Sequence, residues 1–404
     1  MRGSSDSLRI GLIAPPWVAV PPPVYGGTEL VIDQLARGFT DAGHQVVLVT
    51  TGDSTCPVER HWVLPHAIGT TGSMMRALRH VEAAYDAVAD CDIVHDHTLV
   101  GLMWAITTGA EPVLVTTAHG PFNPTLTELY RSVSRRFAVV AISHHQRSTA
   151  PTVPITRVIH HGIDVDGTLF GEGDGGYVVF LGRMHPNKGV HRAISIARAA
   201  GKRILIAAKM WEPDEQRYFA EQVEPLLGPD AVYLGQVGGR AKQELLAGAE
   251  ALVNPIHWPE PFGLVMIEAL AAGTPVLTFA EGAATEIVED GRTGCLCTDD
   301  AGMSARLRTI GDIDRRECRR AAETRFSTRR MVADHLELYR DLLDRRASTP
   351  PPAVLDDPPP RPQPGAGRSV GGRSRTVSTR LHRRRADDGA GQPTGTRTDP
   401  AQMV

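Results

Sequence analysis

The chain has 404 residues, of which 42% are hydrophobic, and its formal net charge is −3. This length suffices to bury two ordinary hydrophobic cores, and the near-balance of 43 Lys and Arg against 46 Asp and Glu argues against a nucleic-acid-binding protein. No apolar run approaches the roughly 18–20 residues of a membrane-spanning helix, and five scattered cysteines do not form a disulfide framework, so we expect a cytoplasmic protein.

Short apolar segments alternate with helix-length segments in the first part of the chain. Strands are predicted over residues 9–14, 45–50, 92–95, 112–117 and 138–143, and helices over 28–42 and 74–89. Short strands that alternate with helices are typical of a parallel sheet covered on both faces. The pattern therefore predicts a Rossmann-like N-terminal domain over residues 1–165.

A second array of the same kind follows. Its predicted strands are residues 177–181, 203–208, 231–235, 251–254 and 275–279. The segment 164–176 between the two arrays is rich in Gly and Asp and lacks apolar periodicity, so we place the domain linker there. We expect an α/β protein with a second Rossmann-like domain over residues 176–327 and a cleft between the two.

The C-terminal part changes in character twice. A helix is predicted over residues 328–346. From there on Pro, Gly, Ser and Arg dominate, and too few apolar residues remain to offset the entropy of ordering the chain. We therefore expect residues 347–404 to be a disordered tail.

Two acidic residues eight positions apart, Glu260 and Glu268, connect a loop to a helix. The Pro- and Gly-rich segment 257–263 predicts a loop after a buried strand, and good helix formers follow from Leu264 until Gly273. The first free N–H groups of such a helix point to where a phosphate can bind. The helix dipole adds only about 0.3–1 kcal/mol at an exposed site, so further positive charge is needed.

That charge is available in the segment 177–189, where a hydrophobic strand is followed by Arg183 and Lys188. Both would emerge at the carboxyl end of a strand, where open α/β sheets bind ligands. Lysine is rare in this chain, at positions 188, 202, 209 and 242. A lysine here therefore suggests a specific use, although a surface lysine at a helix start is the alternative interpretation.

With these motifs the chain resembles the family-4 retaining glycosyltransferases, which have the GT-B architecture. The resemblance rests on an ordered set of motifs: 24–29 (Val-Tyr-Gly-Gly-Thr-Glu), 117–120 (Thr-Ala-His-Gly), 158–164 (Val-Ile-His-His-Gly-Ile-Asp), 181–189 (Leu-Gly-Arg to Asn-Lys-Gly), 260–268, 282–286 and 290–294. It covers about residues 8 to 345. In this family the last helices often pack back onto the first domain, which the resemblance implies for residues 328–346.

The resemblance implies transfer of a sugar from a nucleotide-diphosphate donor to an acceptor hydroxyl, with the anomeric configuration kept. Negative charge builds up on the departing diphosphate, and fixed cations and N–H groups stabilise such charge. By resemblance, Arg183 and Lys188 hold the diphosphate, assisted by the backbone amides of Phe262, Gly263 and Leu264. Departure from the front face, with a phosphate oxygen assisting the incoming hydroxyl, is the usual proposal for the family.

The glutamates and two glycines complete the expected donor site. By resemblance, Glu268 accepts hydrogen bonds from the ribose hydroxyls and Glu260 faces the donor sugar. Gly26 and Gly27, which lack a Cβ, would let the backbone of the first domain approach the phosphates. A structural loop anchor is the alternative for Glu260, and a plain turn is the alternative for the glycines.

Two further residues are expected at the donor sugar. His119 follows a predicted strand of the first domain, and by resemblance it contacts the sugar or orients the acceptor; a hydrogen-bonded structural histidine is the alternative. Glu286 is expected near the sugar or as an acid at a helix start. Ala283 and Thr285 depart here from the Gly and Pro usual in the family, which puts the shape of the sugar pocket in doubt.

No metal or other cofactor is expected. The pairs His95 and His97, His144 and His145, and His160 and His161 lack a zinc-type framework. An Asp-x-Asp at Asp164 and Asp166 falls in the linker and not beside the donor site.

Two other function classes stay open. A phosphorylase-like GT-B enzyme would need a lysine that carries pyridoxal phosphate, for which Lys209 is the candidate. A non-catalytic nucleotide-sugar-binding protein would keep Arg183, Lys188 and Glu268 without turnover.

The motifs specify neither the donor, UDP- or GDP-linked, nor the acceptor, which is a sugar, a lipid-linked molecule or another small molecule. Loops 15–25 and 121–126 are expected to contact the acceptor. Arginines of the tail 347–404 would allow weak peripheral contact with an anionic membrane, but a solvated tail is the simpler interpretation.

Overall fold

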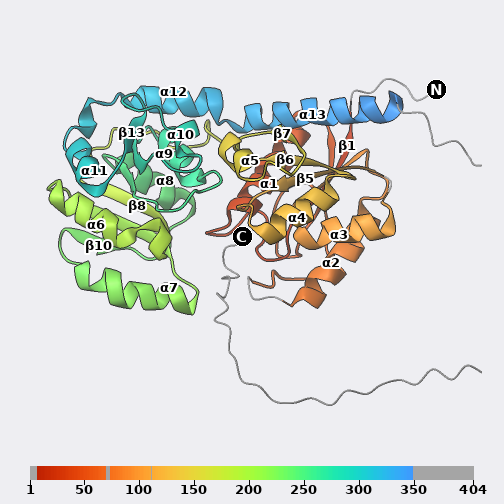
Figure 1. Ribbon diagram of the computed structural model, residues 1–404, viewed down its shortest axis with the longest axis horizontal. Coiled ribbons are helices and arrows are strands. Elements are labelled where there is room, and N and C mark those ends of the chain that lie inside the picture. The colour runs from red at the N-terminus through yellow and green to blue at the C-terminus, as the bar shows by residue number, and fades with distance from the viewer. Residues whose placement is uncertain (1–6, 70–72, 111, 349–404) are drawn as a thin grey trace, which may run out of the picture.

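The computed structural model describes residues 7–69, 73–110 and 112–348, which form two parallel sheets, each covered by helices (Figure 1). The first sheet has the order β3-β2-β1-β4-β5-β6-β7. Its strands are β1 (Arg9–Ile13), β2 (Gln45–Val49), β3 (Glu59–His61), β4 (Ile93–Asp96), β5 (Val113–Ala118), β6 (Phe137–Ala141) and β7 (Ile155–Val158). Its helices are α1 (Gly27–Asp41), α2 (Met74–Ala87), α3 (Leu99–Thr108), α4 (Pro124–Val133) and α5 (His144–Thr149).

The second sheet has the order β10-β9-β8-β11-β12-β13, again with parallel neighbours. Its strands are β8 (Val178–Arg183), β9 (Ile204–Lys209), β10 (Ala231–Tyr233), β11 (Leu252–Asn254), β12 (Val276–Phe279) and β13 (Gly294–Cys297). Its helices are α6 (Val190–Ala199), α7 (Pro213–Tyr218), α8 (Gly239–Gly248), α9 (Leu264–Ala271), α10 (Ala284–Ile287), α11 (Asp300–Leu307) and α12 (Arg315–Arg325). The remaining short helical turns are Pro186–Lys188, Phe219–Val223, Glu224–Leu226 and Ile310–Asp312.

Both sheets reverse their strand order once. In the first sheet the reversal lies between β1 and β4, and in the second it lies between β8 and β11. Loops diverge at such a point and leave a crevice at the carboxyl ends of the strands, which is where open α/β sheets bind ligands. The two predicted Rossmann-like arrays are thus present, and each supplies one binding crevice.

The last helix, α13 (Thr328–Ser348), returns to the first sheet after α12 has covered the second (Figure 1). Phe326, at the end of α12, belongs to a core of the second sheet. From α13, Met331, Leu338 and Tyr339 are buried in a core that they share with α1 and the first sheet. The C-terminal helix therefore adds part of its apolar surface to the N-terminal core.

Two strands, β3 and β7, were not assigned from the sequence, and a third, β13, was expected only as the strand face that carries Cys295 and Cys297. β3 and β7 lie at the two edges of the first sheet, are only three and four residues long, and include exposed polar residues, so neither has the apolar pattern of an inner strand. β13 at the edge of the second sheet carries Cys295 and Cys297, both buried. β6 ends at Ala141, earlier than predicted, because Ser143 caps α5 by accepting a hydrogen bond from the Gln146 N–H at 2.9 Å.

The predicted tail, residues 347–404, lies outside the described residues from position 349 onward. None of the helices within 7–69, 73–110 and 112–348 combines the length and the apolar character needed to cross a membrane.

We predict that Leu338→Ala lowers the free energy of unfolding by about 2–5 kcal/mol, because it leaves a cavity under α13 in the core of the first sheet. Chemical denaturation of the purified variant measures this. Arg340→Ala, on the exposed side of the same helix, should change stability by no more than about 0.5 kcal/mol. Equal stability of both variants would contradict the packing of α13.

Candidate active site

A cavity of about 790 Å³ lies between the two sheets and receives residues from both. Loops after β1 and β5 of the first sheet and after β8 and β11 of the second contribute to its wall. Every residue predicted for the site lines it except Glu286. These are Gly26, Gly27, His119, Arg183, Lys188, Glu260, Phe262, Gly263, Leu264 and Glu268. The separated sequence motifs thus meet in one place.

The loop before α9 has the shape that the sequence suggests. Gly263 precedes the helix with φ +100°, a left-handed conformation that favours glycine, and a Cβ there would lie 2.6 Å from Met266 Cε. α9 begins at Leu264 and carries Glu268 in its second turn. The Phe262 ring is buried, 5.1 Å from the His161 ring, so Phe262 offers a ligand its backbone rather than its side chain.

Lys188 and Glu260 form an ion pair across the strand reversal of the second sheet. Lys188 ends the short helical turn after β8, and Glu260 lies in the loop after β11. Lys188 Nζ donates to Glu260 Oε1 at 2.5 Å, and both side chains are half-buried. The ammonium also lies 5.5 Å from the centre of the Trp258 ring. The two predicted donor residues therefore hold each other in place.

A second pair fixes the other glutamate. Lys242 Nζ, on α8, donates to Glu268 Oε1 at 2.6 Å inside the cavity. Arg183, the last residue of β8, lies with its Nε 3.9 Å from Oε1 of the buried Glu215 on α7. Each charged group of the predicted donor site that lines the cavity therefore has an oppositely charged neighbour there.

Gly26, which precedes α1, and Gly27, its first residue, permit a close approach to neighbouring groups. A Cβ on Gly26 would lie 2.7 Å from Glu29 Oε2, and a Cβ on Gly27 would lie 3.1 Å from Leu264 Cδ1 at the start of α9. Gly27 and Leu264 come from opposite sides of the cleft. A side chain at Gly27 would therefore press on Leu264 across the cleft, whereas one at Gly26 would crowd Glu29 and Pro22 on its own side.

His119 belongs to a row of histidines that leads from the cavity to α13. Its Nε2 lies 2.9 Å from His97 Nδ1, and its ring lies 5.4 Å from that of His161. The His97 ring stacks on His95 at 4.1 Å, and His95 lies 5.5 Å from His335. Burial lowers the pKa of all five below the ordinary value, to about 4 for His335. The wall of the cavity at His119 is therefore uncharged at neutral pH.

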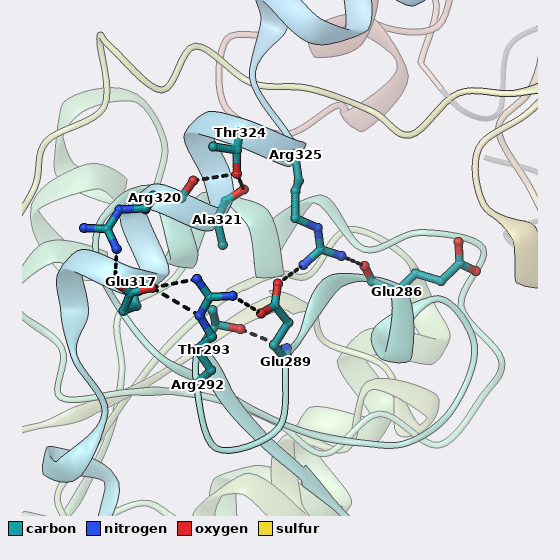
Figure 2. A network of polar contacts seen from close by, with 9 residues as sticks. All are labelled: Glu286, Glu289, Arg292, Thr293, Glu317, Arg320, Ala321, Thr324 and Arg325. Carbon is teal, nitrogen blue, oxygen red and sulfur yellow. Dashed lines mark hydrogen bonds and ion pairs between the residues drawn. The ribbon is translucent and has the colours of Figure 1, made fainter.

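Glu286 faces the first sheet instead of the cavity. Its carboxylate accepts hydrogen bonds from the backbone N–H groups of His144 and His145 at 2.9 and 2.7 Å, and it lies 2.8 Å from His160 Nε2. Figure 2 shows this carboxylate on the far side from Arg325, which donates to the Glu286 backbone oxygen. Although burial disfavours the charged form, these contacts lower the pKa of Glu286. Glu286 thus joins α10 of the second sheet to α5 of the first.

The histidine pairs do not make a metal site within the described ranges. No three His, Cys, Asp or Glu side chains there are arranged to hold a metal ion. The expected independence of metal stays a prediction.

Comparison with known proteins assigns this geometry to a family. Residues 25–166 match the family described as Glycosyltransferase Family 4, and residues 175–312 match the one described as Glycosyl transferases group 1. The chain is 30% identical over 363 residues to the phosphatidyl-myo-inositol mannosyltransferase of Mycolicibacterium smegmatis. The aligned region covers 80% of this chain and 89% of that protein. The chain belongs to the family-4 glycosyltransferases.

Two further comparisons agree with this assignment. The glycogen synthase of Mycobacterium tuberculosis is 34% identical over 165 residues, which is 39% of this chain and 38% of that protein. The crystal structure of AviGT4, a glycosyltransferase involved in avilamycin A biosynthesis, matches with a TM-score of 0.67 at 26% identity over 83% of this chain and 98% of that one. These comparisons confirm the predicted GT-B architecture and identify the protein as an enzyme, a glycosyltransferase.

Several residues in the cavity of this glycosyltransferase were not assigned to the donor site from the sequence. They are Tyr25, Glu29, Lys209, Glu215 and Lys242. The scarcity of lysine was a usable signal, because three of the four lysines line this cavity. The sequence held no signal for Glu215, because it lies in an acidic segment that resembles any solvated helix start.

Buried ionisable groups make the stability of the glycosyltransferase depend on pH. The unfolded chain binds protons at its histidines below about pH 6.5, whereas the fold keeps the five buried ones neutral, so acidification favours the unfolded chain. Burial has the opposite effect at Glu29 and Asp96, whose pKa values rise to about 7 and about 6. Burial also lowers the pKa of His80 and His191, so the histidines outnumber the two acids and net stability falls as the pH decreases.

We predict that the melting temperature falls as the pH is lowered from 6.5 to 4, and that His335→Gln makes this fall shallower. Each histidine that is buried and neutral lowers the free energy of unfolding by up to about 1.4 kcal/mol for each pH unit of acidification in this window. Differential scanning fluorimetry across pH measures both effects, with the exposed His66→Gln as the matched control. An unchanged slope in His335→Gln would contradict the neutral state of His335.

Proposed function

We propose that this protein is a retaining hexosyltransferase that moves a sugar from a nucleoside-diphosphate donor to an acceptor hydroxyl. The observation that carries the proposal is the meeting of Arg183 and Lys188 with Glu260 and Glu268 in one cavity between two Rossmann-like sheets. The relatives include proteins named as a mannosyltransferase and a glycogen synthase, which supports a hexose as the transferred sugar. The acceptor class and the donor base stay open.

The cations account for departure of the nucleotide. Arg183 and Lys188 line the same cavity as the start of α9, so a diphosphate bound among them would meet fixed positive charge as its own charge develops. Lys188 would exchange Glu260 for a phosphate oxygen. The freed Glu260 carboxylate would then face the donor sugar and stabilise positive charge at the anomeric carbon.

The remaining groups orient the substrates. Glu268, held by Lys242, is placed to accept hydrogen bonds from ribose hydroxyls in the second turn of α9. His119 offers an uncharged ring to the sugar or the acceptor from the opposite wall. We propose front-face transfer, in which a donor phosphate oxygen takes the proton of the incoming hydroxyl, because no other base is then required.

We propose further that the reaction needs no metal ion, because two cationic side chains and backbone amides supply the charge at the diphosphate. A cytoplasmic location is proposed from the five cysteines, which are free and buried in the described part of the chain.

Slow hydrolysis of a nucleotide sugar without acceptor tests the function itself. Purified protein incubated with UDP- and GDP-hexoses should release nucleotide from at least one of them, detected by a coupled assay, at a rate that EDTA leaves unchanged. Binding without release would favour the non-catalytic alternative. If EDTA abolished nucleotide release, metal independence would be refuted but the transferase function would not.

Two variants separate transition-state stabilisation from binding. Arg183→Ala should lower kcat/KM by about 10²–10³, because one charge-stabilising group is typically worth about 3–4 kcal/mol in the transition state. Glu268→Ala should raise the donor Kd more than it slows the bound complex, because ribose contacts persist through the reaction. Steady-state kinetics with the exposed Arg316→Ala and Glu244→Ala as matched controls measure this. Turnover like that of the wild type in Arg183→Ala would remove its assigned role.

A further inference from the structure

The four lysines of the chain are each placed beside a glutamate, but they are not placed alike. Lys188, Lys202 and Lys242 donate to their glutamates at 2.5, 2.5 and 2.6 Å. Lys209 Nζ lies 3.4 Å from Glu215 Oε1, longer than the roughly 2.7–2.9 Å of a charge-assisted hydrogen bond. Lys209 is therefore the lysine least satisfied by its partner, although it is only 7% exposed.

The position of Lys209 follows from strand register. Arg183 ends β8, Lys209 ends β9, and the two are paired in the parallel ladder. Both side chains converge on one oxygen of Glu215, with Arg183 Nε at 3.9 Å and Lys209 Nζ at 3.4 Å. The cation already assigned to the diphosphate thus has a second cation as its neighbour at the same edge of the sheet.

Glu215 is itself held in place. It is 2% exposed, and its Oε2 accepts hydrogen bonds from the backbone N–H groups of Trp211 and Glu212 at 2.7 and 3.2 Å. These bonds leave Oε1 to face Arg183 and Lys209. Glu215 therefore acts as a positioning residue for two cations whose mutual repulsion would otherwise separate them.

Aromatic rings cover the rest of the Lys209 ammonium. The Trp211 ring centre lies 4.6 Å from Nζ, and the Tyr25 ring centre lies 5.7 Å from it. Tyr25 comes from the loop before α1, on the other side of the cleft, and its ring packs edge-on against Trp211 at 6.2 Å. Because this ammonium is poorly hydrated and has only one long ion pair, an additional anion beside it would stabilise its positive charge.

We propose that Lys209 is a further ligand of the donor diphosphate, binding a phosphate oxygen beside Arg183, with Glu215 positioning both cations; this rests on the proposed donor. Lysine suits this place because its compact ammonium fits between two rings, where a planar guanidinium would need more room. Burial lowers the pKa of Lys209, and a bound phosphate would favour its charged form. Its paired contacts also make it a poor carrier of pyridoxal phosphate, which requires a free neutral amine.

Calorimetry with nucleoside diphosphates tests this inference. Lys209→Met removes the ammonium and keeps an apolar stem between the rings. It should weaken binding of UDP or GDP, whichever the wild type binds, by about 10- to 100-fold, the range for one hydrogen bond to a charged group. Lys202→Met is the matched control: it breaks a lysine–glutamate pair outside the cavity and should leave the Kd unchanged.

A purely structural role for Lys209 would give a different pattern. The affinity for the corresponding nucleoside, measured by competition, should be the same in Lys209→Met and the wild type, because a nucleoside has no phosphate. Equal losses for nucleoside and nucleoside diphosphate, or no loss for either, would overturn the assignment. If Lys209→Met fails to fold, the double variant Lys209→Met/Glu215→Gln is compared with Glu215→Gln alone, because both then carry the same change beside Arg183. The 10- to 100-fold loss of nucleoside diphosphate affinity, without a loss of nucleoside affinity, is then expected between these two variants.

The outcomes also separate this inference from the proposed function. A wild-type protein that binds no nucleoside diphosphate overturns both. A wild type that binds, together with an unaffected Lys209→Met, overturns the role of Lys209 alone.

Discussion

Pairing of buried opposite charges at the carboxyl edge of the second sheet is the constraint on which the site depends. A charge buried without a partner loses several kcal/mol of hydration, so each cation in the cavity is retained with a carboxylate. Lys188 lies on Glu260 and Lys242 on Glu268, at 2.5 and 2.6 Å. A nucleotide sugar carries groups that can replace each partner: phosphates suit the cations, and hydroxyls suit the carboxylates. The ligand would thus enter a site that is already arranged for its charges.

The second requirement is that the two sheets face each other, and contacts outside the cavity maintain this. The chain passes between the sheets twice, and these two passages are paired: Ile163 N–H donates to Phe326 O, and Thr328 N–H donates to Ile163 O, at 2.9 and 2.8 Å. α13 then packs into the first core, and Glu286 binds the start of α5. These contacts lie beside the cavity, so they set the separation of its walls without occupying it.

The sequence predicted the inner strands of both sheets because they are rich in buried apolar residues, and it missed β3 and β7 because their short segments include polar, exposed residues. The sequence also predicted that Glu260 and Glu268 belong to one site, because the loop and the helix that carry them are adjacent in the chain. It could not find the partners of these residues: Lys242 lies 26 positions from Glu268, and Glu286 meets a helix start more than 140 positions away. Such contacts depend on tertiary packing, which composition and periodicity do not encode. The sequence drew attention to Lys209 only as the lysine that a phosphorylase-like enzyme would need, and its shared partner with Arg183 follows only from strand register.

A crystal structure of the protein with UDP or GDP tests the central claim most directly. We expect the diphosphate between Arg183 and Lys188, over the first turn of α9, with Lys188 Nζ turned from Glu260 to a phosphate oxygen and the ribose at Glu268. Density for the nucleotide outside the cavity between the sheets, or a diphosphate within it that contacts neither Arg183 nor Lys188, would contradict this donor site.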